Sequence, residues 1–164
     1  MISYRQFLII FILLFVFSAC DDTYVYKQEY SIENEVWNKE NAAEFAVDIK
    51  DVNEAYDLYF DIKISDRFKT QNIWMFFEVE APDGTIQRDT TEYMLFDSGG
   101  KTLGENHRNT YEYSLLYKPA VSFPEPGIYR VRVKQGMRKN QTPLAQSVTF
   151  IVRKSEFLIK GEDS

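Results

Sequence analysis

The sequence contains one cysteine, Cys20, and one histidine, His107. A single cysteine excludes an intramolecular disulfide and a cysteine-rich zinc site, and a single histidine excludes any site that needs two imidazoles. Basic residues are also in the minority, with 19 Lys and Arg against 25 Asp and Glu and a formal net charge of −6. Because phosphate binding needs a concentrated cationic face, no nucleic-acid partner is expected. We expect no metal ion and no cofactor.

Apolar runs long enough to cross a membrane as a helix are also missing. The longest run, Phe7–Phe17, has 11 residues, whereas a spanning helix needs about 20. It follows a basic residue, Arg5, and precedes small residues, which is the order of a secretory signal. The motif Phe17-Ser18-Ala19-Cys20 resembles the lipobox of bacterial lipoproteins, in which a signal peptidase cuts before a cysteine that carries a diacylglycerol. We therefore predict a lipoprotein signal peptide at residues 1–19 and lipid attachment at Cys20, which would anchor the protein to a membrane of the cell envelope, on the periplasmic or outer-membrane side.

Removing 19 of the 164 residues leaves 145, which suits a single domain. No linker rich in Pro, Gly or Ser and no internal repeat divides this remainder. We predict an acylated N-terminus and short tether at 20–30, one domain at 31–154, and a charged tail at 155–164.

Along the predicted domain, apolar and polar residues alternate with the period of a β-strand. Two turns punctuate the pattern, Pro82-Asp83-Gly84 and Pro124-Glu125-Pro126-Gly127, because Pro presets φ and Gly accepts a positive φ. No segment keeps a helical period for more than two turns. The pattern predicts an all-β fold, an antiparallel β-sandwich that is immunoglobulin-like or jelly-roll-like. Clear strands are expected near 56–64, 73–79, 111–117, 129–134 and 148–152, and weaker ones near 44–49, 85–89 and 93–96.

Catalytic residues do not form a recognisable pattern. Asp57 and Asp61 share one face of a predicted strand, and at about 3.3 Å per residue their Cα atoms lie roughly 13 Å apart. Paired glycosidase carboxyls lie about 5 to 9.5 Å apart, so this pair is too wide. A Ser–His–Asp triad would have to use His107, which lies in a polar loop beside Arg108. We therefore predict a protein that is not an enzyme.

Two surface features remain as candidate binding sites. Arg130, Arg132 and Lys134 form a basic stripe on one predicted strand, and Arg138 and Lys139 follow in the next turn. This surface could contact a partner protein. Cross-strand pairing with outward acids of a neighbouring strand, such as Asp57, Asp61 or Glu112, is the simpler explanation of this stripe. The aromatic residues Trp37, Tyr59 and Trp74, together with Phe76, lie off the predicted core face, where they could stack on sugars or pack beneath a loop.

Several motifs resemble the gliding-motility lipoprotein family GldH of Bacteroidetes-type bacteria. In one of these motifs, a Gly-Lys-x-Leu-Gly loop, Thr102 stands where the family pattern leads us to expect Trp. The last two motifs below are the most specific, since a Pro-Gly turn and Gln-x-Met-Arg at this spacing are seldom found together. The motifs are Cys20, Trp37, Ala55-Tyr56-Asp57-Leu58, Gln71-Asn72-Ile73-Trp74-Met75-Phe76, Pro82-Asp83-Gly84, Asp89-Thr90-Thr91-Glu92, Gly100-Lys101-Thr102-Leu103-Gly104, Phe123-Pro124-Glu125-Pro126-Gly127-Ile128-Tyr129 and Gln135-Gly136-Met137-Arg138.

This resemblance implies a membrane-anchored envelope lipoprotein, a non-enzymatic component of the gliding-motility machinery that is linked to type IX secretion. Its partners would be the membrane, through the lipid, and other envelope or motility proteins. The alternative hypothesis is a surface glycan-binding lipoprotein that uses Trp37, Tyr59 and Trp74.

Overall fold

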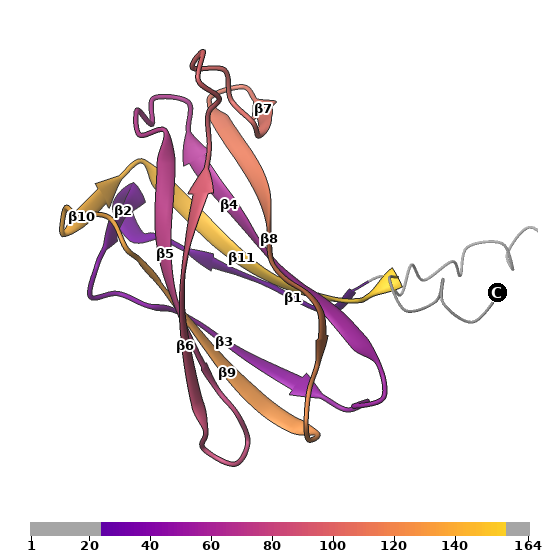
Figure 1. The fold of residues 1–164 in the computed structure, drawn as a ribbon. Coiled ribbons are helices and arrows are strands. Elements are labelled where there is room, and N and C mark those ends of the chain that lie inside the picture. Colours follow the sequence, from indigo (N-terminus) through magenta and orange to yellow (C-terminus); the bar gives the residue numbers. More distant parts are fainter. Residues whose placement is uncertain (1–23, 157–164) are drawn as a thin grey trace, which may run out of the picture.

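The computed structural model describes residues 24–156 of the chain, which form strands and one short 3-10 helix (Figure 1). The predicted signal peptide, Cys20 and most of the predicted tail lie outside the described residues. The elements are β1 (Tyr24–Ser31), η1 (Glu33–Glu35), β2 (Val36–Asn38), β3 (Ala43–Ile49), β4 (Ala55–Ser65), β5 (Asn72–Glu80), β6 (Ile86–Met94), β7 (Glu105–His107), β8 (Thr110–Ser122), β9 (Gly127–Gln135), β10 (Gln141–Pro143) and β11 (Ala145–Lys154).

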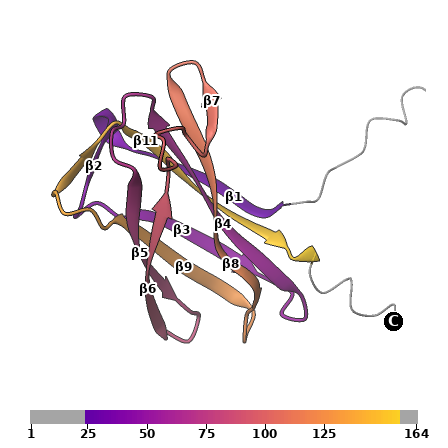
Figure 2. The same ribbon diagram turned by 45° about the horizontal axis from the view of Figure 1, so that its top comes forward.

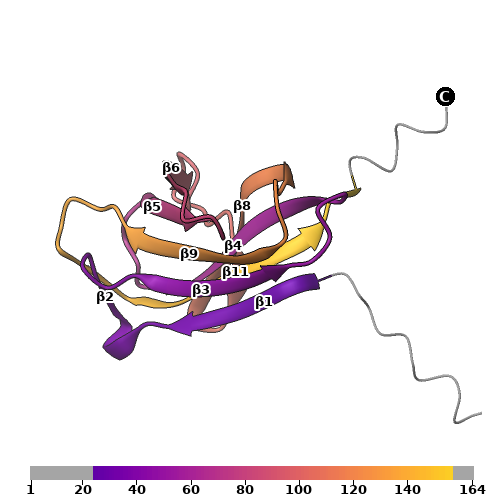
Figure 3. The same cartoon turned by 90° about the horizontal axis from the view of Figure 1, so that it is seen from below.

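Two main antiparallel sheets face each other. One has five strands in the order β1-β11-β4-β8-β7, and the other has four in the order β3-β9-β5-β6. A third, two-stranded sheet pairs β2 with β10. Seen from below, the four-stranded and five-stranded sheets lie as two layers (Figure 3). The prediction of an all-β fold with antiparallel sheets is confirmed.

The core lies between the two main sheets and is built from alternate residues of each strand, as the period of two requires. In β3, buried and exposed residues alternate without exception. In β4 the residues on one face, among them Phe60, are buried. The ring of Phe60 lies 5.0 Å from Phe77 of the other sheet and 4.7 Å from Phe150 of its own sheet, measured between ring centroids. Burying each such ring stabilises the fold by about 1.5 to 3 kcal/mol.

The strand that is apolar on both faces, β5, is central, since it lies between β9 and β6. Because Trp74 and Phe76 make the second face of this segment apolar too, its sequence predicts either a central strand or a strand covered on both faces, and the first of these is correct. Ile73, Met75 and Phe77 point into the core, while Trp74 and Phe76 on the other face are 39% and 41% exposed. The outer face of this strand is therefore a partly exposed aromatic surface.

Strand boundaries differ from the predictions where periodicity is weak. The two weak strands predicted near 85–89 and 93–96 are one strand, β6. Most of its residues are exposed, so buried and exposed positions do not alternate clearly along it. Strand β1 begins at Tyr24, so most of the segment predicted as a tether pairs with β11 in the sheet. Strands β2, β7 and β10 have three residues each, which is too short for a period to be visible.

Both predicted turns are present and depend on glycine. Gly84 has φ +85° and closes the β5–β6 hairpin by donating from its amide to the Ala81 carbonyl, at 2.9 Å. Gly127 has φ +140° at the start of β9, and a Cβ there would lie 2.8 Å from Pro82 Cγ. A side chain at Gly127 would therefore strain the backbone and also collide with the neighbouring turn.

The two ends of the sandwich carry different parts of the chain. Tyr24 of β1 pairs with Arg153 of β11, so the chain enters and leaves the sandwich at one end. β2 and β10 lie at the opposite end, which we call the distal end (Figures 1 and 2). No helix among residues 24–156 is long and apolar enough to span a membrane.

Candidate functional site

The predicted basic stripe is on the outer face of β9, but acidic residues surround its centre. Arg132 lies 2.8 Å from Glu78 and 3.2 Å from Glu80, both on β5, and 3.5 Å from Glu44 on β3. Arg130 lies 3.7 Å from Glu80. The simpler explanation, cross-strand pairing, therefore holds for both arginines, although the acids come from β3 and β5 of the same sheet and not from Asp57, Asp61 or Glu112.

These ion pairs change the acidity of the groups involved. The hydrogen bond from Arg132 lowers the pKa of Glu78, with a smaller contribution from Arg88. The same hydrogen bond raises the pKa of Arg132. Both groups are thus held in their charged forms at neutral pH, and the charges of Arg130 and Arg132 are largely neutralised by their neighbours. Lys134, the third member of the stripe, pairs in register with Phe76 and has no ion pair among the described residues.

The aromatic residues proposed for sugar stacking do not form a platform. Trp37 is buried, at 1% exposure, and its indole nitrogen donates to the carbonyl of Asn41 at 2.9 Å. Tyr59 lies on the outer face of the five-stranded sheet, where the Arg153 guanidinium stacks 5.0 Å from its ring centroid. Trp74 lies on the outer face of the other sheet. The three side chains therefore cannot contact one ligand together.

Trp74 and Phe76 form an exposed aromatic patch of their own, which we call the Trp74–Phe76 patch. The chain leaving β9 packs against it, because the Gly136 amide donates to the Trp74 carbonyl at 2.7 Å and the Trp74 amide donates to Met137 Sδ at 3.3 Å. A Cβ on Gly136 would lie 3.1 Å from the Phe76 ring, so a glycine allows this close approach.

Beside this patch, at the distal end, a groove of about 880 Å³ opens. Arg67 and Lys69 from the β4–β5 loop line it, as do Arg138 and Lys139 from the connection between β9 and β10. Apolar groups complete the lining, namely Phe68, Trp74, Met137, Pro143 and Leu144. Among residues 24–156, no acidic residue lines this space. We call it the distal groove.

Two buried side chains position the cations of the distal groove. Gln135 is completely buried, and its side chain donates to the carbonyls of Lys139 and Asn140, both at 3.2 Å, and accepts from the Met137 amide at 2.8 Å. The glutamine thereby shapes the loop that carries Arg138. Phe68, which lies between Arg67 and Lys69 in sequence, is 6% exposed and packs into the core. Both cations consequently stand on the exposed side of their loop.

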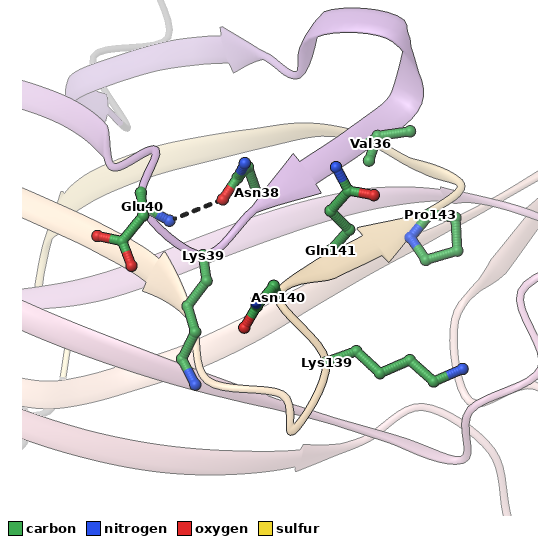
Figure 4. Close-up of a pocket in the computed structure, with 8 residues that line it drawn as sticks. All are labelled: Val36, Asn38, Lys39, Glu40, Lys139, Asn140, Gln141 and Pro143. Carbon is green, nitrogen blue, oxygen red and sulfur yellow. Dashed lines mark hydrogen bonds between the residues drawn. The ribbon is translucent and has the colours of Figure 1, made fainter.

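A second hollow, of about 780 Å³, lies on the other side of β10 (Figure 4). Lys139 lines both spaces, and Lys39 and Glu40 line the second one. Figure 4 shows the side chains of Lys39 and Lys139 on either side of Asn140. Sequence reasoning included Arg138 and Lys139 in the basic patch but missed Arg67, Lys69 and Lys39. A signal was present in Arg67-Phe68-Lys69, where two cations flank an aromatic residue at a predicted loop.

The residues weighed for catalysis are scattered. The Asp57 carboxylate accepts from the Ala120 amide at 2.8 Å, and His107 lies 3.3 Å from Glu105 on the exposed strand β7. Within residues 24–156, no three His, Cys, Asp or Glu side chains gather as a metal site would require. In the described part of the chain, the residues weighed for catalysis therefore do not come together at one site.

Two facing antiparallel sheets with no long helix among residues 24–156 place the protein in the class of all-β sandwich domains. The chain belongs to the GldH lipoprotein family, whose sequence pattern matches residues 24–151. It is 33% identical over 138 residues to the gliding motility lipoprotein GldH homolog of Christiangramia forsetii, which covers 84% of this chain and 83% of that protein. It is 29% identical over 129 residues to the gliding motility lipoprotein GldH of Flavobacterium johnsoniae, covering 79% and 77%.

Among solved structures, a chain from the structure of infectious bursal disease virus Gx strain aligns with 86% of this chain and 35% of its own length. The TM-score is 0.24 and the identity 8%, a likeness too small to support any argument.

Proposed function

We propose that this protein is a non-enzymatic component of the gliding-motility machinery, linked to type IX secretion, and that it acts through contacts with other envelope proteins. Acylated Cys20 would hold it on a membrane of the cell envelope. Membership of the GldH lipoprotein family supports the motility role and the membrane association.

The observation that carries the proposal is the pairing of an exposed aromatic patch with a cationic groove on one end of the sandwich. Soluble domains rarely leave large aromatic side chains uncovered side by side unless they bind something. Trp74 and Phe76 are such a pair. The charges of Arg130 and Arg132 are satisfied within the sheet, so the contacts we expect involve the distal end. The glycan-binding alternative loses its three-aromatic platform, because Trp37 is buried and Tyr59 and Trp74 lie on different sheets.

The anchor is tested by Cys20→Ala. Without the thiol no diacylglycerol can be attached, so the variant should leave the membrane fraction or remain unprocessed at its larger size. Cell fractionation, labelling with a radioactive fatty acid and treatment with globomycin measure this. Ser18→Ala is the matched control, since it keeps a small residue before the cut and should remain membrane-bound. Unchanged size and lipid labelling of Cys20→Ala would refute the anchor.

The partner contact is tested by cross-linking in native membranes. Trp74→Ala combined with Phe76→Ala should remove the cross-linked envelope proteins that the unaltered protein gives, while membrane attachment persists. Tyr59→Ala, on the opposite sheet, is the control and should leave cross-linking unchanged. If the double variant keeps every cross-linked product, the Trp74–Phe76 patch is not the contact surface.

A further inference from the structure

The cations of the distal groove differ from most others in the described sandwich. Eight basic side chains between residues 24 and 156 lie within 4.0 Å of a carboxylate, and Arg67, Lys69, Arg138 and Lys139 are not among them. The protein as a whole has six more acidic than basic residues. A cationic groove without acids in such a chain attracts negative charge supplied from elsewhere.

The groove also has an apolar lining, which limits the kinds of ligand that would fit it. Phe68, Trp74, Met137 and Leu144 line it together with the cations. The wall includes Thr142, which is buried and whose Oγ1 has no hydrogen-bond partner among the described residues. A small inorganic anion would leave the apolar lining unused. A segment that carries both carboxylates and a large apolar side chain would satisfy both kinds of surface.

The position of the groove argues for a protein rather than the surface of the anchoring membrane. Tyr24, at the terminal end of the sandwich, follows Cys20 by four positions, and four extended residues span at most about 14 Å. The groove lies at the other end, beyond Ser65 at the end of β4. The 11 residues of β4 place these ends about 33 Å apart. An anchor at Cys20 thus holds the terminal end of the domain, where Tyr24 lies, next to the lipid headgroups. The distal groove then lies at the end away from the membrane.

We propose that the distal groove binds an extended acidic segment of another envelope protein, with an aromatic or aliphatic side chain of that segment resting on Trp74. This inference rests on the proposed function, since it names the chemistry of the partner that the lipoprotein contacts. The carboxylates of the segment pair with Arg67, Lys69, Arg138 and Lys139. The second hollow beyond β10 contains Lys39 and Lys139 but also the acidic Glu40, so we assign the acidic segment to the distal groove alone.

Trp74 provides a direct reporter of binding. The chain has two tryptophans, of which Trp37 is 1% exposed and Trp74 is 39% exposed. The acylated protein in neutral detergent micelles is titrated with a glutamate-rich peptide that contains phenylalanine and lacks tryptophan. We expect the emission of Trp74 to shift to shorter wavelength and the affinity to fall as salt is raised. A peptide with lysine in place of glutamate should give no shift, and Trp74→Phe should abolish the signal.

The cations are tested by Arg138→Glu combined with Lys139→Glu. The affinity for the glutamate-rich peptide should fall about tenfold or more, because two attractive charges become repulsive. Lys50→Glu combined with Lys101→Glu is the matched control, since both side chains are exposed, lie outside the groove, and change the net charge equally. The control should bind within about twofold of the unaltered protein. Circular dichroism verifies folding, and Arg138→Gln with Lys139→Gln replaces the first variant if that one unfolds.

Three outcomes would overturn the inference. The first is that the unaltered protein does not bind the glutamate-rich peptide, and the second is that both charge-reversal variants lose affinity equally. The third is that micelles doped with phosphatidylglycerol shift the Trp74 emission as much as the peptide does, while phosphatidylcholine does not, which would assign the groove to anionic lipid. The motility proposal is judged by different measurements, namely membrane attachment and cross-linking through the Trp74–Phe76 patch. Loss or retention of peptide binding by the groove variant therefore bears on the groove inference alone.

Discussion

Arg132 and Arg138 have the same side chain and lie six positions apart, yet their surroundings are opposite. Arg132 contacts three carboxylates, with the nearest at 2.8 Å, whereas Arg138 lines a groove to which the described part of the chain contributes no acid. Nothing in the local sequence separates them, because the acids that neutralise Arg132 come from β3 and β5. The charge that is available to a partner is therefore decided by neighbours that are distant along the chain.

The Arg132–Glu78 pair predicts a pH dependence of stability. The pairing lowers the pKa of Glu78, so its contribution is present above the pKa of an unfolded glutamate, about 4.3. The contribution is lost as the pH falls through the lower pKa of the folded state. Melting temperatures measured between about pH 6 and pH 3 should fall, and Glu78→Gln should show a smaller fall. Glu33→Gln, an exposed acid without an ion pair among the described residues, should follow the unaltered profile. Identical profiles for both variants would show that the pair contributes nothing.

At the scale of the element, β5 shows how a strand can be apolar on both faces and still have one of them exposed. Its neighbours β9 and β6 satisfy its backbone hydrogen bonds on both sides. Central position follows from those bonds, whereas burial of a face requires another layer. One layer covers Ile73, Met75 and Phe77, and among the described residues nothing covers Trp74 and Phe76 to the same degree.

Two adjacent residues of β5 test this arrangement. Phe77→Ala removes a ring that is 2% exposed and should cost about 3 to 5 kcal/mol of unfolding free energy. Phe76→Ala removes the neighbouring ring, which is 41% exposed, and should cost less than about 1 kcal/mol. Urea denaturation of the two variants gives the comparison. Equal costs would indicate that the register of β5 is shifted by one residue, since such a shift exchanges the two faces.

For the whole molecule, the strand order determines where the fold is most stable. β11 lies between β1 and β4, and all residues from Ser147 to Val152 are buried, so even its outward residue Ile151 is shielded. β6 is an edge strand, and most of its residues are exposed. Stability is thus expected to decrease from the five-stranded sheet toward the free edge of the other sheet.

Hydrogen exchange measured by mass spectrometry tests this gradient. Amides of β4 and β11 should exchange only through global unfolding, and those of β6 should exchange through local opening at much faster rates. Exchange of the denatured protein gives the intrinsic rate of each peptide as a control. If β6 is protected as strongly as β11, its edge is covered, and the strand order does not set the gradient.

The sequence by itself determines the class of the fold, because a period of two and well-formed turns are local properties. It accounts for β3, β4, β5, β8, β9 and β11 and for the turns at Gly84 and Gly127, and it carries the motifs that identify the family. Local patterns do not reveal strands of three residues, a β6 whose residues are mostly exposed, or the entry of Tyr24–Ser31 into the sheet.

Only the tertiary structure decides which surface is available for binding. It buries Trp37, places Tyr59 and Trp74 on different sheets, and neutralises Arg130 and Arg132. It also brings Arg67 and Lys69 beside Arg138 and Lys139, about 70 positions further along the chain. The physical reason is that exposure and charge pairing depend on contacts between distant strands, whereas alternation depends only on the backbone geometry of one strand.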